Sequence, residues 1–278
     1  MVPSMLRAFA NLPRRQVHYR HGGSGEATLV MLHASPGCGR QMEGPGTALC
    51  AHRWVVAPDR PGNGDSPRLP IEGPEIADYA RAELELLDGL GIENCDVYGM
   101  HTGACVAVEL AILAPTRIRR VVLDGLGLFP AAQAAQFLAR YAPAVTPDPA
   151  GAHLTWAFNF IRDQALFFPW YDARPENARG LGLPGASAMH ESVLDLLKSI
   201  ETYHLGYRAS FRYDPARLRL VAQKTLAITA DDDPLFEYLA PALRLLPNAV
   251  ARPVPSLRAP DRAAGLARVI DAFLAAAE

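Results

Sequence analysis

The chain has 278 residues, of which 50% are hydrophobic and 20% are charged, and its formal net charge is −2 at pH 7. This length allows one α/β domain with a large buried core, with or without an insertion. The near-neutral charge gives no electrostatic support for binding nucleic acid or an anionic membrane, and no apolar run reaches the roughly 18 residues that a membrane span needs.

The four cysteines lie in apolar stretches and form no C-x-x-C pair: Cys38, Cys50, Cys95 and Cys105. We therefore expect buried thiols in a reducing compartment, and neither disulfides nor metal ligands. Residues 1–16 contain no sustained apolar core and no small-residue cleavage site, so they make a poor secretory signal. These features together predict a cytoplasmic protein.

Strand and helix patterns alternate along the first half of the chain. Apolar runs predict strands buried on both faces, and apolar residues at helical spacing predict helices that cover them. The expected elements are strands over 15–20, 27–35 and 53–59, a helix over 73–91, a strand over 94–100, a helix over 101–115 and a strand over 117–125.

Helical and aromatic sequence interrupted by prolines dominates from about residue 128 to residue 220. The sheet pattern then returns, with expected strands over 224–230 and 248–256 and expected helices over 234–247 and 265–278. The alternation predicts an α/β fold with a mostly parallel central sheet and helices on both faces. Its core domain comprises residues 1–127 and 221–278, and residues 128–220 form an inserted helical lid.

The segment YGMHTGA, residues 98–104, has the pattern of a strand that turns sharply into a helix. The residue at the corner of such a turn often takes a positive φ, which histidine tolerates better than most residues. His101 occupies that corner, Gly99 and Gly103 allow the backbones to approach, and the helix from Thr102 presents free amides to an anion. His101 is therefore a candidate general base, and a covalent nucleophile is the alternative. The third possibility is that His101 occupies an active site that has lost its catalytic activity.

The order of the elements resembles the α/β-hydrolase superfamily, and the likeness covers essentially the whole chain. Four motifs carry it: LHASPG at 32–37, APDRPGNGDSP at 57–67, YGMHTGA at 98–104 and TADDDPL at 229–235. The resemblance implies an oxyanion turn in the first motif, a nucleophile elbow in the third and an acid-bearing loop in the fourth. The H-x-S-P and G-x-H-T-G forms further resemble a non-serine subgroup of the superfamily.

Two members of the usual Ser–His–Asp triad are missing. His101 stands where the resemblance places serine, and residues 250–265, where it places a histidine, contain none. A serine acyl-enzyme mechanism is therefore not expected. The resemblance places the acid at Asp233, with Asp231 and Asp232 as near alternatives, or at the strand end at Asp124. Either Asp233 or Asp124 is expected to orient the imidazole, although Asp233 before Pro234 also suits a turn that caps the next helix.

The oxyanion turn supplies the remaining candidate binding residues. The backbone amides of Ser35 and Thr102 are expected to form a two-donor oxyanion hole, and the Ser35 hydroxyl also reaches the ligand. His33 is a further candidate for this binding site, with loop packing as the alternative that the resemblance favours, and Asp59 is assigned to loop structure. In the lid, Trp156 belongs to an aromatic stretch, residues 156–171, that favours a pocket for apolar rings, with packing of the lid on the core as the alternative. Lid residues that could replace the missing acid or base are His153, His190, His204, Tyr203, Tyr207 and Tyr213.

These residues favour an enzyme that acts on a small, largely apolar or aromatic carbonyl-type substrate. Either His101 activates a water molecule for hydrolysis, or it removes a substrate proton in a lyase or isomerase reaction. A catalytically inactive ligand-binding protein is the alternative. No phosphate loop, dinucleotide fingerprint or metal-ligand motif is present, so no cofactor and no metal are expected. The expected partner is a small-molecule substrate, not nucleic acid or membrane. The sequence also allows a homodimer.

Overall fold

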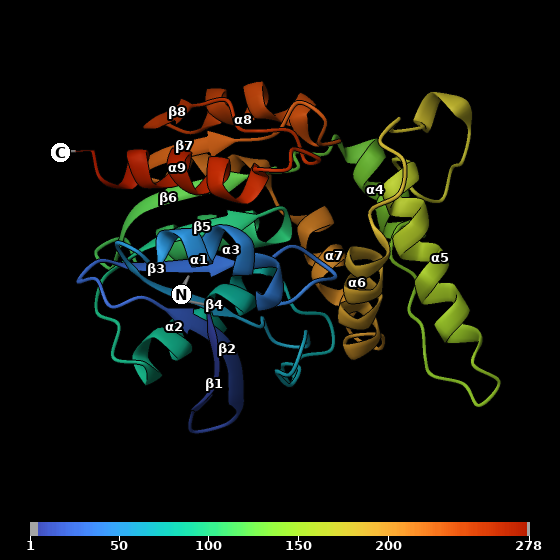
Figure 1. The fold of residues 1–278 in the computed structure, drawn as a ribbon, viewed down its shortest axis with the longest axis horizontal. Helices are drawn as coiled ribbons and strands as arrows, with labels where there is room; N and C mark the ends of the chain where they lie inside the picture. Colours follow the sequence, from blue (N-terminus) through green and yellow to red (C-terminus); the bar gives the residue numbers. More distant parts are fainter. Residues whose placement is uncertain (1–4, 277–278) are drawn as a thin grey trace.

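The computed structural model describes residues 5–276, and Figure 1 shows them as one sheet flanked by helices. The sheet has eight strands in the order β1-β2-β4-β3-β5-β6-β7-β8. β1 pairs with β2 and β2 pairs with β4 in the antiparallel sense, and every other neighbouring pair is parallel. The strands are β1 Leu6–Asn11, β2 Gln16–Gly22, β3 Thr28–Leu32, β4 Trp54–Pro58, β5 Cys95–Met100, β6 Ile118–Asp124, β7 Lys224–Ile228 and β8 Ala249–Ala251. The predicted α/β fold class is confirmed.

Successive side chains of the central strands enter two different cores. On β3, Leu29 and Met31 pack in the core that α1 (Glu43–Leu49) and α9 (Arg262–Leu274) cover. Val30 and Leu32 point the other way, into the core that also contains side chains of α2, α3 and α8. These helices span Ile76–Gly89, Thr102–Leu113 and Leu239–Leu245. Burying each such side chain contributes about 1.5–3 kcal/mol, which explains why Leu29–Leu32 are all apolar.

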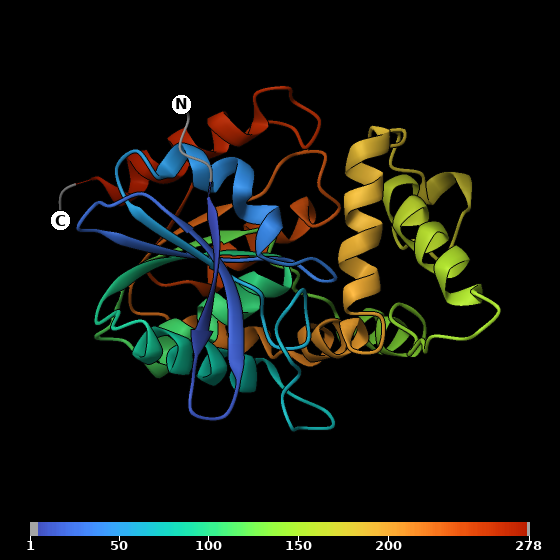
Figure 2. The ribbon, with the colours of Figure 1, turned by 60° about the horizontal axis from the view of Figure 1, so that its bottom comes forward.

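The chain leaves the sheet between β6 and β7 to form the segment that the sequence assigns to a lid. Its helices are α4 Ala131–Arg140, α5 Ala152–Leu166, α6 Ala186–Lys198 and α7 Tyr203–Arg212, with short 3₁₀ helices at Pro175–Asn177 and Pro215–Leu220. Figures 1 and 2 both show α5 and α6 beside the sheet. Ion pairs connect α6 to the core, from Asp195 to Arg40 and from Lys198 to Asp65, both at 2.8 Å.

Several elements differ from the sequence prediction. β1 was not expected, since Leu6 and Phe9 on this edge strand are exposed and leave only a weak pattern. Helix α1 was also missed, because its glycines and proline disfavour a helix that forms by packing against α9. The last strand is limited to Ala249–Ala251, and prolines follow it. The predicted final helix extends to residue 278, and its last two residues lie outside the described range.

Two expectations from composition can be compared with the structure. All four cysteines are buried and unpaired, as predicted. Within residues 5–276, no helix combines the length and the apolar character that crossing a bilayer requires.

Candidate active site

His101 lies at the sharp turn between β5 and α3, at the carboxyl edge of the parallel strands. Its backbone has φ 49° and ψ −112°, and among residues 5–276 it is the only non-glycine residue with a positive φ. Such a conformation costs about 1–3 kcal/mol and persists only where the surrounding structure imposes it. The hydrogen bond from the His101 amide to the Asp124 carbonyl, at 2.8 Å, helps to hold the turn.

Three glycines allow backbone and side-chain atoms to approach closely around the His101 turn. A Cβ at Gly99 would lie 2.2 Å from the Gly103 carbonyl oxygen, so the strand approaches the helix as predicted. A Cβ at Gly103 would instead meet the Leu32 carbonyl oxygen at 2.3 Å, so this glycine serves the contact with β3. At Gly125 a Cβ would lie 2.4 Å from His101 Cδ2, and the sequence did not single out this residue. Gly125 therefore leaves space for the imidazole over the end of β6.

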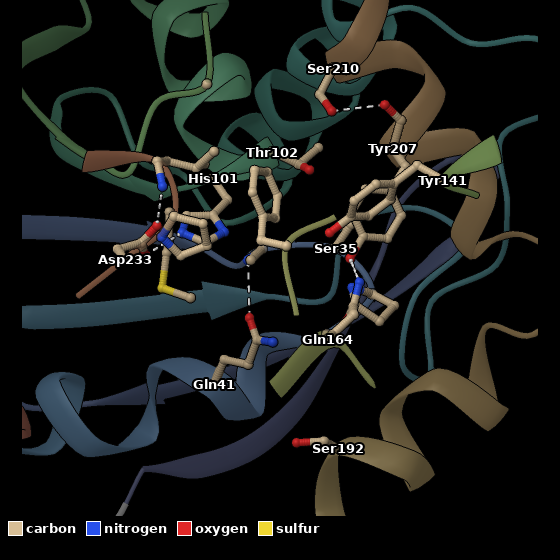
Figure 3. A pocket seen from close by; sticks show the side chains of 18 of the residues that line it. Ser35, Gln41, His101, Thr102, Tyr141, Gln164, Ser192, Tyr207, Ser210 and Asp233 are labelled. Atoms are coloured by element: carbon tan, nitrogen blue, oxygen red, sulfur yellow. Dashed lines mark hydrogen bonds and ion pairs between the residues drawn. The ribbon is translucent and has the colours of Figure 1, made fainter. Parts of the chain in front are cut away.

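The imidazole of His101 is hydrogen-bonded to Asp233, with 2.9 Å between Nε2 and Oδ2 (Figure 3). The other carboxylate oxygen of Asp233 accepts the Leu235 amide at 2.8 Å, so Asp233 both orders the turn and contacts the ring. An ionised carboxylate only accepts, so Nε2 carries the proton and the lone pair of neutral His101 resides on Nδ1. Nδ1 has no hydrogen-bond partner among the described residues, and 31% of the side chain is exposed. The ring thus presents a free base to the cavity.

The Asp233 carboxylate also sets the charge of the pair. Burial acts to lower the pKa of His101, but the charge and hydrogen bond of Asp233 outweigh it, so the pKa of His101 is raised. For Asp233, burial acts to raise the pKa, and the opposing effects of His101 and of the Leu235 amide leave it lowered. Asp233 is therefore ionised at neutral pH and stabilises a proton that His101 accepts.

The carboxylate of Asp124 does not contact the His101 imidazole. It accepts the Tyr98 hydroxyl at 2.7 Å and lies 3.6 Å from a guanidinium nitrogen of Arg262. Burial raises the pKa of Asp124. Of the two carboxylates that the sequence proposed as partners of the imidazole, the structure brings Asp233 to it, and Asp124 takes part in a separate buried network.

The oxyanion turn lies against the start of the helix that follows His101, since a Cβ at Gly103 would be 2.7 Å from the His33 carbonyl oxygen, and Figure 3 shows Ser35 and Thr102 in the same cavity. Neither the Ser35 amide nor the Thr102 amide has a hydrogen-bond partner within residues 5–276. Both residues line the cavity with His101. The side chain of Gln41, which the sequence did not single out, accepts the Ala34 amide at 3.0 Å and so orders the turn. The two amides are thus free to bind a negatively charged oxygen.

The expectation that His33 contacts the ligand needs correction. His33 is completely buried and does not line the cavity. Its Nδ1 donates to the Ala34 carbonyl at 2.8 Å, and its Nε2 accepts the Arg60 amide at 3.0 Å. Burial and the nearby Arg60 charge lower the pKa of His33 to about 3. The neutral ring therefore holds two loops together, which is the alternative that the sequence left open.

The cavity beside His101 has a volume of about 330 Å³, and aromatic rings form much of its wall. These rings belong to Phe129, Phe137, Tyr141, Phe168, Tyr207 and Phe211. Trp156 is not among the lining residues; it stacks on Phe160 at 4.9 Å between ring centroids, so its predicted contact with substrate is replaced by packing within the inserted segment. The volume suits a small ligand with an aromatic or apolar group.

No second imidazole reaches the cavity from the described residues. Leu257 lines it where the resemblance would place a histidine, and Asp232 fixes the Leu257 amide at 2.9 Å. Tyr207 is the one lid candidate that lines the cavity within residues 5–276. The lid candidates that do not line it are His153, His190, His204, Tyr203 and Tyr213. Arg179, absent from the sequence-based candidates, does line it.

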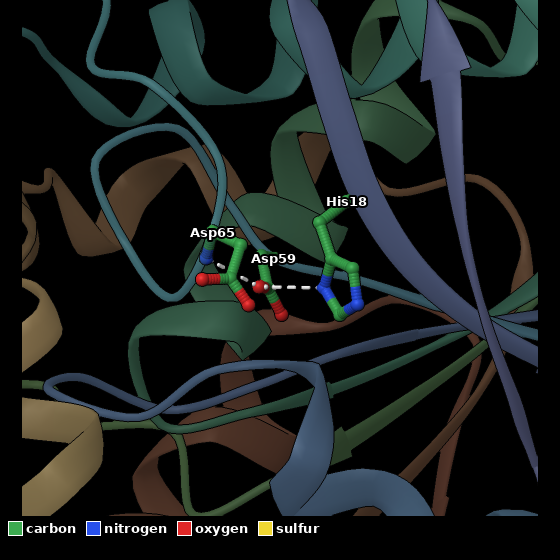
Figure 4. A group of neighbouring side chains, drawn as sticks. All are labelled: His18, Asp59 and Asp65. Carbon is green, nitrogen blue, oxygen red and sulfur yellow. Dashed lines mark hydrogen bonds and ion pairs between the residues drawn. The ribbon is translucent and has the colours of Figure 1, made fainter.

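A second group of potential ligand atoms lies outside the cavity, at His18, Asp59 and Asp65 (Figure 4). The Asp59 carboxylate is already occupied, because it accepts the amides of Gly39 and Asp65, both at 2.8 Å, and bonds His18 Nδ1 at 2.8 Å. Burial acts to raise the pKa of Asp59, but the His18 hydrogen bond and the amides leave it lowered. The geometry fits the structural role in the loop that the sequence predicted for Asp59.

Changing Asp59 to Asn should lower the free energy of unfolding by about 3 kcal/mol, because a buried amide loses its charged acceptor. The exposed matched change Asp65→Asn should cost less than about 1 kcal/mol. Urea denaturation measures both, and a chelator should leave the wild-type melting temperature unchanged. Equal costs for the two variants, together with a chelator effect, would instead indicate a metal site.

Comparison with known proteins identifies the fold family of the chain. A family profile described as alpha/beta hydrolase fold matches residues 27–255. A 2-hydroxy-6-oxononadienedioate/2-hydroxy-6-oxononatrienedioate hydrolase of Dechloromonas aromatica is 34% identical over 119 residues, which are 40% of this chain and 40% of that protein. A 2-hydroxy-6-oxo-6-phenylhexa-2,4-dienoate hydrolase of Comamonas testosteroni is 31% identical over 114 residues, again 40% of each chain.

Solved structures extend the likeness to the whole fold. The epoxide hydrolase CorEH superposes with a TM-score of 0.75 and 20% identity, over 98% of both chains. The enol-lactonase from Burkholderia xenovorans LB400 gives a TM-score of 0.69 and 18% identity, over 97% of this chain. At these identities the structures compare the fold alone, whereas the family profile covers most of the sequence. The chain belongs to the alpha/beta hydrolase fold family.

Proposed function

We propose that this protein is a hydrolase in which His101 is the general base in place of a serine-based triad. The observation that carries the proposal is the pairing of His101 Nε2 with Asp233 Oδ2, which leaves Nδ1 without a partner among the described residues, in a cavity that Ser35 and Thr102 also line. We also propose that the chain belongs to the non-serine subgroup defined by the G-x-H-T-G elbow.

The reaction follows from the protonation state of the ring. A water molecule attacks the substrate carbonyl while Nδ1 of His101 takes its proton, so the new C–O bond forms as the imidazolium appears. Asp233 stabilises that imidazolium, and the two amides bind the oxygen that takes the carbonyl electron pair. Collapse of the intermediate expels the leaving group, which receives the proton from His101. One water is consumed and the enzyme returns to its starting state.

The cavity supports a substrate that is small, carbonyl-containing and largely apolar or aromatic. Its volume of about 330 Å³ leaves room for one ring with a short functional chain, and the wall is rich in phenyl and phenol rings. The names of the curated relatives describe hydrolases of hydroxy-oxo-dienoates, which carry such a carbonyl group. Residues 128–220 would act as the lid that excludes bulk water from the reaction.

Hydrolysis in water labelled with heavy oxygen tests the reaction type. Aryl ketones with an enol side chain, aryl esters and aryl epoxides are suitable substrates to screen, and a hydrolase must place one labelled oxygen in the product. Turnover without label, accompanied by solvent proton exchange, would identify a lyase or isomerase instead. Tight binding with no turnover of any class would favour the inactive binding protein.

A fluorophosphonate probe should leave the protein unlabelled, because no cavity serine has an imidazole partner among the described residues. Ser35 accepts from Arg60, Ser192 donates to the Ala188 carbonyl, and Ser210 donates to the Tyr207 carbonyl. Mass spectrometry of the intact chain measures labelling. A stoichiometric adduct on any of these serines would contradict the mechanism.

A further inference from the structure

Arg60 is a completely buried cation directly behind the oxyanion turn. Within residues 5–276 no carboxylate forms an ion pair with it, and its Nε and Nη1 atoms are buried without hydrogen-bond partners. The Tyr79 ring lies 5.8 Å from its Cζ. Glu83 is also buried, and burial raises the pKa of Glu83 to about 7, so its charge only partly offsets the guanidinium. An incompletely paired buried charge is costly and needs a reason to be kept.

The one side-chain hydrogen bond of Arg60 in the described chain goes to Ser35. Its Nη2 donates to Ser35 Oγ at 3.1 Å. A guanidinium has no acceptor, so the serine oxygen must accept, and its own proton stays available for another acceptor. No group in residues 5–276 takes that proton, and Ser35 lines the cavity with His101 and Thr102. A ligand in the cavity can therefore accept this proton.

The inserted segment leaves space for this hydroxyl. Gly206 lies in α7, and a Cβ built there would be 2.8 Å from Ser35 Oγ and 3.7 Å from Arg60 Nη1. Glycine inside a helix is less favourable than alanine. An alanine at this position would force the hydroxyl to rotate off Arg60, so the glycine preserves the Arg60–Ser35 hydrogen bond at a cost in helix stability.

We propose that Ser35 donates a charge-assisted hydrogen bond to the substrate oxygen that becomes negative, and that Arg60 is the positioning residue that fixes and polarises its hydroxyl. The oxyanion hole then has three donors: the amides of Ser35 and Thr102 and this hydroxyl. The proposal rests on the proposed function for the identity of the anionic oxygen. Its geometry predicts binding of aromatic oxyanions even without turnover.

The test uses para-nitrophenolate as an oxyanion probe and para-nitroanisole as a neutral probe of similar shape. Wild type should bind the phenolate more tightly and shift its visible absorption to shorter wavelength, because its oxygen accepts strong hydrogen bonds. Ser35→Ala and Gly206→Ala should each weaken phenolate binding by about 10- to 100-fold and leave anisole binding unchanged. His101 is present in every variant, so its own effect cancels in the comparison.

Variants of Arg60 test the positioning role. Arg60→Met should lose the same phenolate preference, and Arg60→Lys should restore part of it, a rescue that a purely structural residue would not give. If Arg60→Met does not fold, Gly206→Ala decides, because it keeps Arg60 and moves only the hydroxyl. Wild type without phenolate preference, or Ser35→Ala that binds phenolate like wild type, would overturn the inference.

The probe also separates this inference from the proposed function. If the phenolate preference depends on Ser35 while no carbonyl substrate is turned over, the role of the Ser35 hydroxyl as a donor is supported and the hydrolase proposal fails. If turnover depends on His101 while Ser35→Ala binds phenolate normally, the hydrolase proposal stands and the third donor is refuted.

Discussion

Exchanging His101 for Asn is expected to lower kcat on the hydrolysed substrate by about 10²- to 10⁴-fold, because the cavity loses its general base. Asparagine is a suitable replacement, since its amide keeps a polar planar group at this position but cannot act as a base. The KM should change little, because the ring contributes to the reaction more than to binding. Steady-state kinetics on a substrate from the labelled-water screen, with circular dichroism to check the fold, measures this.

Two further variants make the His101 result specific. The exposed His190 lies on α6 outside the cavity, and His190→Asn should keep kcat close to wild type. His101→Ser restores a serine at the elbow without any histidine to activate it, so it should be as inactive as His101→Asn and stay unlabelled by the fluorophosphonate. If kcat of His101→Asn stays near the wild-type value, another group in the cavity is the general base. Tyr207 would be the first residue to test.

The parts of the site that the sequence predicted are those encoded by consecutive residues. The elbow at His101 depends on a buried strand, a tight turn and a helix that follow each other, so local pattern was enough to locate it. Asp233 belongs to a short loop directly after β7, whose position at the sheet edge follows from the parallel topology. Strand β3 was likewise predictable, because it is buried along its whole length and almost entirely apolar, and β5 and β6 contain shorter buried apolar runs.

The parts that the sequence did not predict depend on packing between distant segments. Nothing local distinguishes Gly206 from other helical glycines until α7 lies against Ser35. Arg60 looks like an ordinary loop arginine, and only its complete burial makes it unusual. Trp156 illustrates the opposite error, because an aromatic-rich stretch suggests a pocket wall whether its rings face the cavity or each other.

Replacing Asp233 with Asn should lower the plateau of kcat by about 10²- to 10⁴-fold and move the acid limb of the pH profile to lower pH. The plateau falls because an amide no longer holds the proton on Nε2, and the Nδ1-protonated tautomer has no free base toward the cavity. The limb moves because burial, which lowers the pKa of His101, is no longer outweighed by the Asp233 charge. A variant damaged only in structure would lose rate without moving the limb.

Asp124→Asn is the matched control for Asp233→Asn. Its carboxylate faces Tyr98 and Arg262, and its effect on the pKa of His101 is weaker than that of Asp233. The control should therefore cost stability, with a smaller displacement of the acid limb and most of the plateau kept. Profiles that stay at the wild-type plateau and limb in both variants would show that neither carboxylate orients the imidazole.

Stability and activity should respond to pH in opposite directions through the His101–Asp233 pair. The raised pKa of His101 means that its contribution to stability is complete below its unfolded-state pKa and is lost as pH rises through the folded-state value. The base is active only in the neutral form, so the rate rises over that same interval. The lowered pKa of Asp233 means that its contribution to stability is present above the unfolded-state pKa of Asp233 and is lost as pH falls through the folded-state pKa of Asp233. Urea denaturation of wild type and Asp233→Asn at about pH 5 and about pH 9 should show that the stability advantage of wild type over the variant is smaller at pH 9, because His33 and Glu83 titrate in both proteins and only wild type has the His101–Asp233 pair.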